Sequence, residues 1–194
     1  MKKISDHISY KEATHSRTAL RLDIKNKPNK QQLNNMVKLA EEVFEPLRVY
    51  ANGPIKINSF FRSPKLNEAI GGSTKSQHCH GQAVDIDDTY GYLTNAEMFN
   101  HIKEYLDFDQ MIWEFGDDDN PDWVHVSYVS PSKNRNRCLK AYKEYGKTKY
   151  AIKYIVVIIS TYTNGLRSKL YALALCLLFL YNSVFCFSIF FVSF

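Results

Sequence analysis

The segment from Ser76 to Asp87, SQHCHGQAVDID, holds two histidines, a cysteine and two acids around one glycine. Zinc-type ions bind imidazole nitrogen, thiolate sulfur or carboxylate oxygen, and a catalytic zinc usually has three protein ligands and one open position. The segment therefore offers more possible ligands than one metal site needs. Which of these side chains lie close enough to bind one ion depends on how the chain folds.

The end of this segment predicts a short strand. Asp85 and Asp87 fall on one face of an extended chain and Ile86 falls on the other. His78 lies seven residues before Asp85, and Gly81 between them favours a turn, so the imidazole and the carboxylate can meet. The simpler alternative for this pair is a neutral histidine hydrogen-bonded to a surface carboxylate.

Two neighbours of His78 are weaker candidates for metal binding. His80 is two residues away, but the turn expected at Gly81 favours a supporting or solvent-facing role for it. Cys79 points away from His78 in an extended chain and is more typical of a small buried side chain.

A third ligand has to come from another part of the chain, and His125 is the best donor. It stands in the middle of the predicted strand DWVHVSY, on the face shared with Trp123, where a neighbouring strand could present it to the same ion. Hydrolysis also needs an acid beside the metal that takes a proton from water and returns it to the leaving group. Asp122 fits that role, although it could simply begin the strand after a turn.

The periodicity of the chain predicts an α+β fold. Helical spacing over residues 29–47 and 94–106 follows capping pairs, and the first helix should bend or end near Pro46. Residues 61–76 are expected to form a loop. Strands are predicted at four places: 55–58, 83–87, 110–115 and 123–128. This order suits a small antiparallel sheet with helices packed on one side.

The composition indicates one folded domain, residues 1–150, and an apolar tail, residues 151–194. Residues 171–194 contain no charged side chain and are long enough to cross a bilayer as a helix. The tail could be a membrane anchor, a partner-binding or holin-like helix, or an extension that is not native. Membrane contact is expected only through this tail.

Several classes of protein are disfavoured. Residues 1–150 carry 22 basic and 20 acidic side chains, which gives little support to nucleic-acid binding. The four cysteines form no C-x-x-C pair, and their low density is typical of a reducing compartment. The N-terminus has no apolar run, so we do not expect export through a secretory signal.

The residues quoted above also resemble a known family. Ser76, His78, Gly81, Ala83 and Asp85 reproduce the S-x-H-x-x-G-x-A-x-D signature of the zinc D-Ala-D-Ala carboxypeptidases and related phage endolysin peptidases. The run SFFRSPKLN resembles the Y-R-S loop of that family, and DWVHVSY is similar to its closing acid-x-x-His motif. The resemblance covers residues 8–150 and implies the hedgehog/DD-peptidase fold.

The resemblance implies a role for each matching residue. One zinc ion would be bound by three ligands: His78, Asp85 and His125. Asp122 would be the catalytic base. Arg62 would hold the carbonyl oxygen or carboxylate of the substrate, where a fixed cation stabilises the developing oxyanion. Ser76 would help to orient the peptide.

The expected function is therefore a zinc metallopeptidase that hydrolyses peptidoglycan stem peptides, as a D,D-carboxypeptidase or an L,D/D,D-endopeptidase. We expect a monomeric phage lysis enzyme that stays in the host bacterial cytoplasm until lysis. Two alternatives are open. One is a catalytically silent zinc-binding module for cell-wall recognition or virion structure, and the other is a membrane-associated protein whose tail is the functional part.

Overall fold

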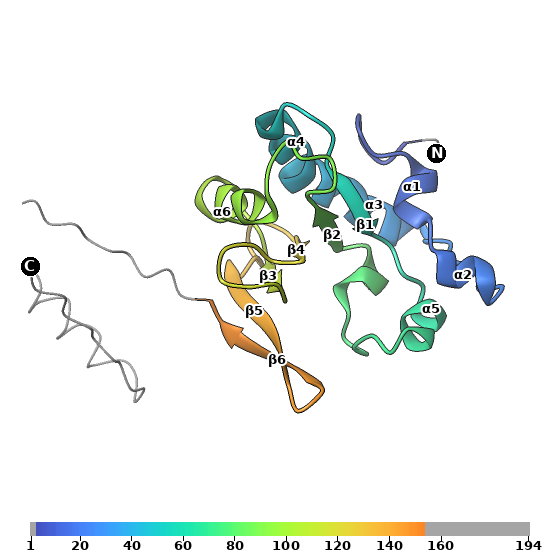
Figure 1. Cartoon of the computed structure of the whole chain (residues 1–194). Coiled ribbons are helices and arrows are strands. Elements are labelled where there is room, and N and C mark those ends of the chain that lie inside the picture. Colours follow the sequence, from blue (N-terminus) through green and yellow to red (C-terminus); the bar gives the residue numbers. More distant parts are fainter. Residues whose placement is uncertain (1–2, 154–194) are drawn as a thin grey trace, which may run out of the picture. The chain divides into compact units, whose positions relative to one another are not determined.

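The computed structural model describes residues 3–153, and most of the predicted apolar tail lies outside them (Figure 1). The helices are α1 (Tyr10–Thr14), α2 (Arg17–Arg21), α3 (Lys30–Leu39), α4 (Glu45–Ala51), α5 (Pro64–Ala69) and α6 (Asn95–Tyr105). The strands are β1 (Lys56–Ser59), β2 (Ala83–Asp87), β3 (Gln110–Glu114), β4 (Trp123–Ser127), β5 (Arg137–Glu144) and β6 (Lys147–Ile152). Within residues 3–153, no helix combines the length and hydropathy that crossing a membrane requires.

The six strands form one sheet in the order β1-β2-β4-β3-β5-β6. Neighbouring strands are antiparallel except for β3 and β5, which are parallel. The predicted α+β class is confirmed. The parallel pair departs from the wholly antiparallel sheet that the sequence indicated.

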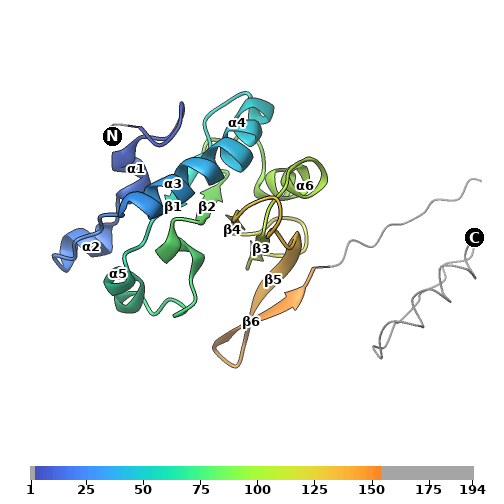
Figure 2. The same ribbon diagram turned by 180° about the vertical axis from the view of Figure 1, so that it is seen from behind.

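One face of the sheet packs against helices. Its apolar side chains form a single buried cluster with residues of α3, α4 and α6, and its strand members include Val84, Ile86, Met111, Val124 and Val126. Figure 2 shows α3 in front of β1 and β2 when the domain is seen from behind, with α4 above them. Each large apolar side chain buried in this way contributes about 1.5–3 kcal/mol. Because side chains alternate along a strand, the intervening residues face the opposite side of the sheet.

The first long helix does not end at Pro46. Helix α3 passes through a π-helical turn, η1 (Ala40–Phe44), into α4. Proline has no N–H for the usual helical hydrogen bond, and the wider turn before it lets the chain stay helical. The capping boxes predicted for α3 and α6 are both present, formed by Asn29 with Gln32 and by Thr94 with Glu97.

The predicted loop over residues 61–76 contains a short helix, α5. The Ser63 hydroxyl accepts a hydrogen bond from the Leu66 backbone N–H at 3.3 Å and so caps the helix. Pro64 occupies the first turn, where its missing N–H costs nothing. Cap and proline are adjacent in the sequence, and this was the local signal for the helix.

The hairpin of β5 and β6 is absent from the sequence prediction. A two-residue turn joins the strands, and both of its residues have positive φ, 49° at Tyr145 and 74° at Gly146. This backbone matches the twist of the flanking strands. Strand β6 runs to Ile152, two residues beyond the predicted boundary at residue 150.

Candidate metal centre and active site

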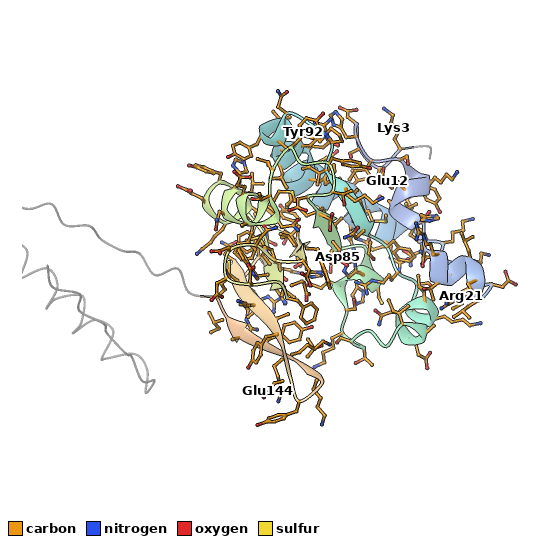
Figure 3. The ribbon with its side chains drawn as sticks, in the orientation of Figure 1. Lys3, Glu12, Arg21, Asp85, Tyr92 and Glu144 are labelled. Carbon is orange, nitrogen blue, oxygen red and sulfur yellow. The ribbon has the colours of Figure 1, made fainter. Side chains whose placement is uncertain are left out.

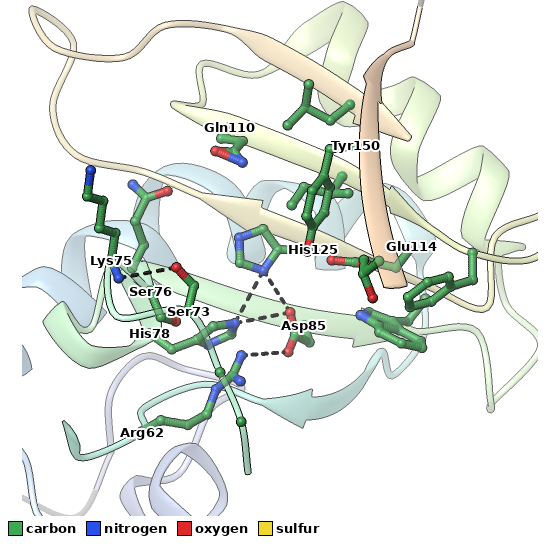
Figure 4. A pocket seen from close by; sticks show the side chains of 18 of the residues that line it. Arg62, Ser73, Lys75, Ser76, His78, Asp85, Gln110, Glu114, His125 and Tyr150 are labelled. Atoms are coloured by element: carbon green, nitrogen blue, oxygen red, sulfur yellow. Dashed lines mark hydrogen bonds and ion pairs between the residues drawn. The ribbon is translucent and has the colours of Figure 1, made fainter. Parts of the chain in front are cut away.

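The face of the sheet opposite the helices carries two of the predicted metal ligands. Asp85 of β2 and His125 of β4 are register partners, and His78 reaches them from the 3₁₀ helix η2 (Gln77–His80) (Figure 4). His125 Nδ1 lies 2.8 Å from Asp85 Oδ1. His78 Nε2 lies 3.2 Å from that oxygen and 3.2 Å from His125 Nδ1. The structure therefore brings the three predicted ligands together.

The positions of these donor atoms fit one metal ion. All three lie within 4.8 Å of one another. Bonds of about 2.0–2.1 Å to a tetrahedral ion would place neighbouring ligand atoms about 3.3 Å apart, close to the separations found here. Two imidazoles and one carboxylate are a donor set of catalytic zinc sites, in which a fourth position stays open.

The surroundings of His78 prepare it to be a ligand. Its Nδ1 lies 2.6 Å from the Phe60 carbonyl oxygen, which can only accept a hydrogen bond. The proton therefore sits on Nδ1, and the lone pair of Nε2 points toward Asp85 and His125. Burial lowers the pKa of His78 despite the nearby Asp85 charge, so the imidazole is neutral, as metal binding requires.

Helix α3 fixes the position of η2. Gln32 Nε2 donates to the Cys79 carbonyl oxygen at 2.9 Å, and Asn35 Nδ2 donates to the His80 carbonyl oxygen at 2.8 Å. Gly81 ends η2 with φ 68°, which confirms the predicted turn. A Cβ at Gly81 would lie 2.5 Å from the Gln32 carbonyl oxygen. His80 itself is exposed and does not belong to the ligand group.

Replacing Gly81 with Ala is expected to lower the free energy of unfolding by about 2–5 kcal/mol, because left-handed strain and overpacking against α3 add together. Gly91→Ala is the matched control, since Gly91 has φ 71° and no atom within 4 Å of the position that the added methyl group would occupy. The control should lose only the conformational part, about 1–2 kcal/mol. Urea unfolding measures both, and equal losses would contradict the proposed contact with α3.

Arg62, the residue predicted to hold the substrate, lies beside the candidate ligands. Its Nη2 donates to Asp85 Oδ2 at 3.3 Å, and its buried Nε has no hydrogen-bond partner among residues 3–153. Burial alone would raise the pKa of Asp85, but its contacts with the His78 and His125 imidazoles outweigh burial and hold that pKa well below its usual value. Asp85 is therefore a carboxylate at neutral pH.

His78, Asp85 and His125 line a pocket with a volume of about 680 Å³. Its lining includes residues 71–73, Lys75 and the predicted substrate residue Ser76, together with side chains of β3, β5 and β6. Ile112 and Leu139 give the pocket an apolar part. In Figure 3, Asp85 lies near the middle of the described domain, whereas Glu144 lies at the end of the β5–β6 hairpin.

Glu114, at the end of β3, is a pocket residue that the sequence analysis missed. It is only 8% exposed, and burial raises its pKa to about 7. Figure 4 shows its carboxylate on the same side of the pocket as Tyr150. A signal was present in QMIWEF, because an acid is unusual in a buried strand and alternation places Glu114 on the same face as Ile112.

The side chain of Asp122, the predicted base, is not brought to the pocket. Asp122 is exposed and does not line the cavity. Its backbone N–H donates to the Glu114 carbonyl oxygen at 3.0 Å, and its own carbonyl oxygen accepts from Asn95 Nδ2 at 3.1 Å. Trp123 and His125 face the pocket, so alternation along the strand turns the residue before Trp123 away from it.

Comparisons with known proteins agree with this site. A family model described as peptidase M15 matches residues 6–127, which include the three ligands and Arg62. A comparison with curated proteins finds no match. Peptidases of the M15 family depend on zinc, so the match supports a zinc peptidase activity for this chain. The donor set described above agrees with it. Because the match spans more than half of the sequence, the chain belongs to the M15 peptidase family.

Proposed function

We propose that this M15 peptidase hydrolyses peptide bonds in the stem peptides of bacterial peptidoglycan. One observation carries the proposal: the donor atoms of His78, Asp85 and His125 lie close together. The same pocket is also lined by Arg62 and Glu114. The peptidoglycan substrate is supported by the resemblance of the S-x-H-x-x-G-x-A-x-D run to D-Ala-D-Ala carboxypeptidases and phage endolysin peptidases. The proposed activity is that of a D,D-carboxypeptidase or an L,D/D,D-endopeptidase.

Zinc held by the three ligands would lower the pKa of a water molecule and polarise the scissile carbonyl. In our proposal, the Glu114 carboxylate takes a proton from the attacking water as the new C–O bond forms. Glu114 then gives a proton to the leaving nitrogen as the C–N bond breaks. A pKa of about 7 suits both transfers near neutral pH. We assign this role to Glu114 because the Asp122 side chain lies outside the pocket.

Arg62 supplies positive charge where the carbonyl oxygen becomes an oxyanion. Its hydrogen bond to Asp85 keeps the guanidinium beside the ligands, so little reorganisation is needed when the substrate binds. A preorganised cation of this kind stabilises the transition state more than the bound substrate. Ser76, on the pocket wall, is proposed to orient the peptide.

Hydrolysis of purified cell walls tests the substrate. The full-length protein with zinc is expected to release new amino groups from peptidoglycan, with cleavage sites read by mass spectrometry, and to leave casein uncut. Cleavage of casein alone would contradict the cell-wall substrate. Stoichiometric zinc without cleavage of any wall type would instead support the silent zinc-binding module.

We further propose that the protein acts as a monomer in phage lysis and remains in the host cytoplasm until the membrane fails. The wall substrate lies outside that membrane, so the timing of access would control activity. Sedimentation of the purified protein and fractionation of infected cells before and after lysis test these two statements. A stable dimer, or wall-bound protein before lysis, would contradict them.

A further inference from the structure

The β5–β6 hairpin lies beyond the part of the chain that the family model matches, residues 6–127, yet it lines the pocket. Four of its residues contribute to the lining: Arg137, Leu139, Thr148 and Tyr150. The matched region therefore builds the metal ligands, and the hairpin adds a wall of the pocket. A wall placed beside the ligands can contact the substrate at the bond that is cut.

The sheet register puts Tyr150 in the same cross-strand row as Glu114. Glu114 pairs with Ala141 of β5, and Ala141 pairs with Tyr150 of β6. Register partners point to the same face of a sheet. Ala141 is buried and has only a methyl group, so it leaves space above it for the two longer side chains. Figure 4 shows the Tyr150 ring extending from β6 into the pocket between His125 and Glu114.

The Tyr150 hydroxyl is suited to donate a hydrogen bond. A tyrosine phenol keeps its proton at neutral pH because its ordinary pKa is about 10, and burial raises the pKa of Tyr150 further. Among residues 3–153, the structure shows no hydrogen bond from this hydroxyl. The residue is 55% exposed, and its exposed part faces a cavity that a peptide could enter.

We propose that Tyr150 is a catalytic residue of this peptidase, whose phenol hydroxyl donates a hydrogen bond to the carbonyl oxygen of the scissile peptide bond. The hydrogen bond strengthens as that oxygen gains negative charge during attack by water, and it complements the positive charge of Arg62. The inference rests on the proposed peptidase function. In this role, strand β6 holds Tyr150 at the edge of the pocket.

Tyr150→Phe tests the proposal, with Tyr142→Phe as its matched control. Tyr142 lies on the same hairpin but on the opposite face of β5, next to Ala141. Tyr150→Phe is expected to lower kcat by about 10- to 100-fold, less than a fully buried oxyanion donor because water can partly replace the phenol. KM and zinc content should stay near those of the unchanged protein. The control Tyr142→Phe should equal the unchanged protein in kcat, KM and zinc content.

A second measurement does not depend on turnover. A phosphinic analogue of a stem peptide carries tetrahedral, negatively charged oxygens, and calorimetry gives its affinity for each zinc-loaded variant. Tyr150→Phe should weaken binding of the phosphinate by about tenfold while binding of an uncleaved stem peptide changes little. Equal phosphinate affinity and equal kcat in Tyr150→Phe and the unchanged protein would overturn only the role of Tyr150. Absence of both cleavage and phosphinate binding in the unchanged protein would overturn the peptidase function, and this role with it.

Discussion

Replacing Glu114 with Gln is expected to lower kcat by about 10²–10⁴-fold, the usual contribution of a general acid–base residue. The amide has nearly the same shape as the carboxyl group but cannot accept the proton of the attacking water. Glu114 is not one of the three ligands, so zinc content should remain at one ion per chain. Cleavage of a defined stem peptide, followed by chromatography, gives kcat and KM.

Asp122→Asn is the control for this prediction, because the acid-x-x-His motif assigns the base to Asp122. The exposed position of Asp122 leads us to expect at most a small change in kcat. The opposite pattern, with Asp122→Asn inactive and Glu114→Gln fully active, would return the role of base to Asp122. Unfolding curves of both variants show whether either loss comes from stability instead.

Replacing His125 with Ala is expected to abolish cleavage and to weaken zinc binding by more than about 100-fold, since even partners outside the ligand set contribute 10- to 100-fold. Two ligands, His78 and Asp85, would remain, and the open site would admit water in place of the imidazole. Metal content after dialysis against a weak chelator measures the affinity. The same chelator at higher concentration should inactivate the unchanged protein, and added zinc should restore it.

His80→Ala is the matched control for the metal prediction. His80 lies in the same motif as His78, but its side chain is exposed and outside the ligand group. We expect normal zinc content and normal cleavage in this variant. Loss of zinc from His80→Ala as large as that from His125→Ala would contradict the ligand set proposed here.

The sequence alone was informative where structure depends on near neighbours in the chain. The capping boxes of α3 and α6 each join residues three apart, and the turn at Gly81 depends on its own backbone conformation. The alternation of residues 83–87 likewise placed Asp85 on the face opposite Ile86. Hydrogen bonds and backbone preferences within a few residues decide these features, so they can be read before the fold is known.

The partners of β3 and β5 could not be predicted in the same way. Their parallel pairing joins segments 27 residues apart, Gln110 with Arg137, through contacts that no local pattern encodes. The short alternating runs of residues 137–152 also gave a weak strand signal, because several positions on both faces are charged or exposed. Pairing with β3 stabilises β5, and β5 in turn gives β6 a partner.

Residue types and spacing were enough to predict His78, Asp85 and His125 as candidate metal ligands, and their donor atoms lie together in the structure. Which acid and which phenol share the pocket with those residues depends on how distant strands pair. Glu114 and Tyr150 enter the pocket because the register of β3, β5 and β6 aligns them in one row, whereas Asp122 lies outside it. Register is fixed by packing between distant strands, and a shift of one residue would turn each side chain to the other face.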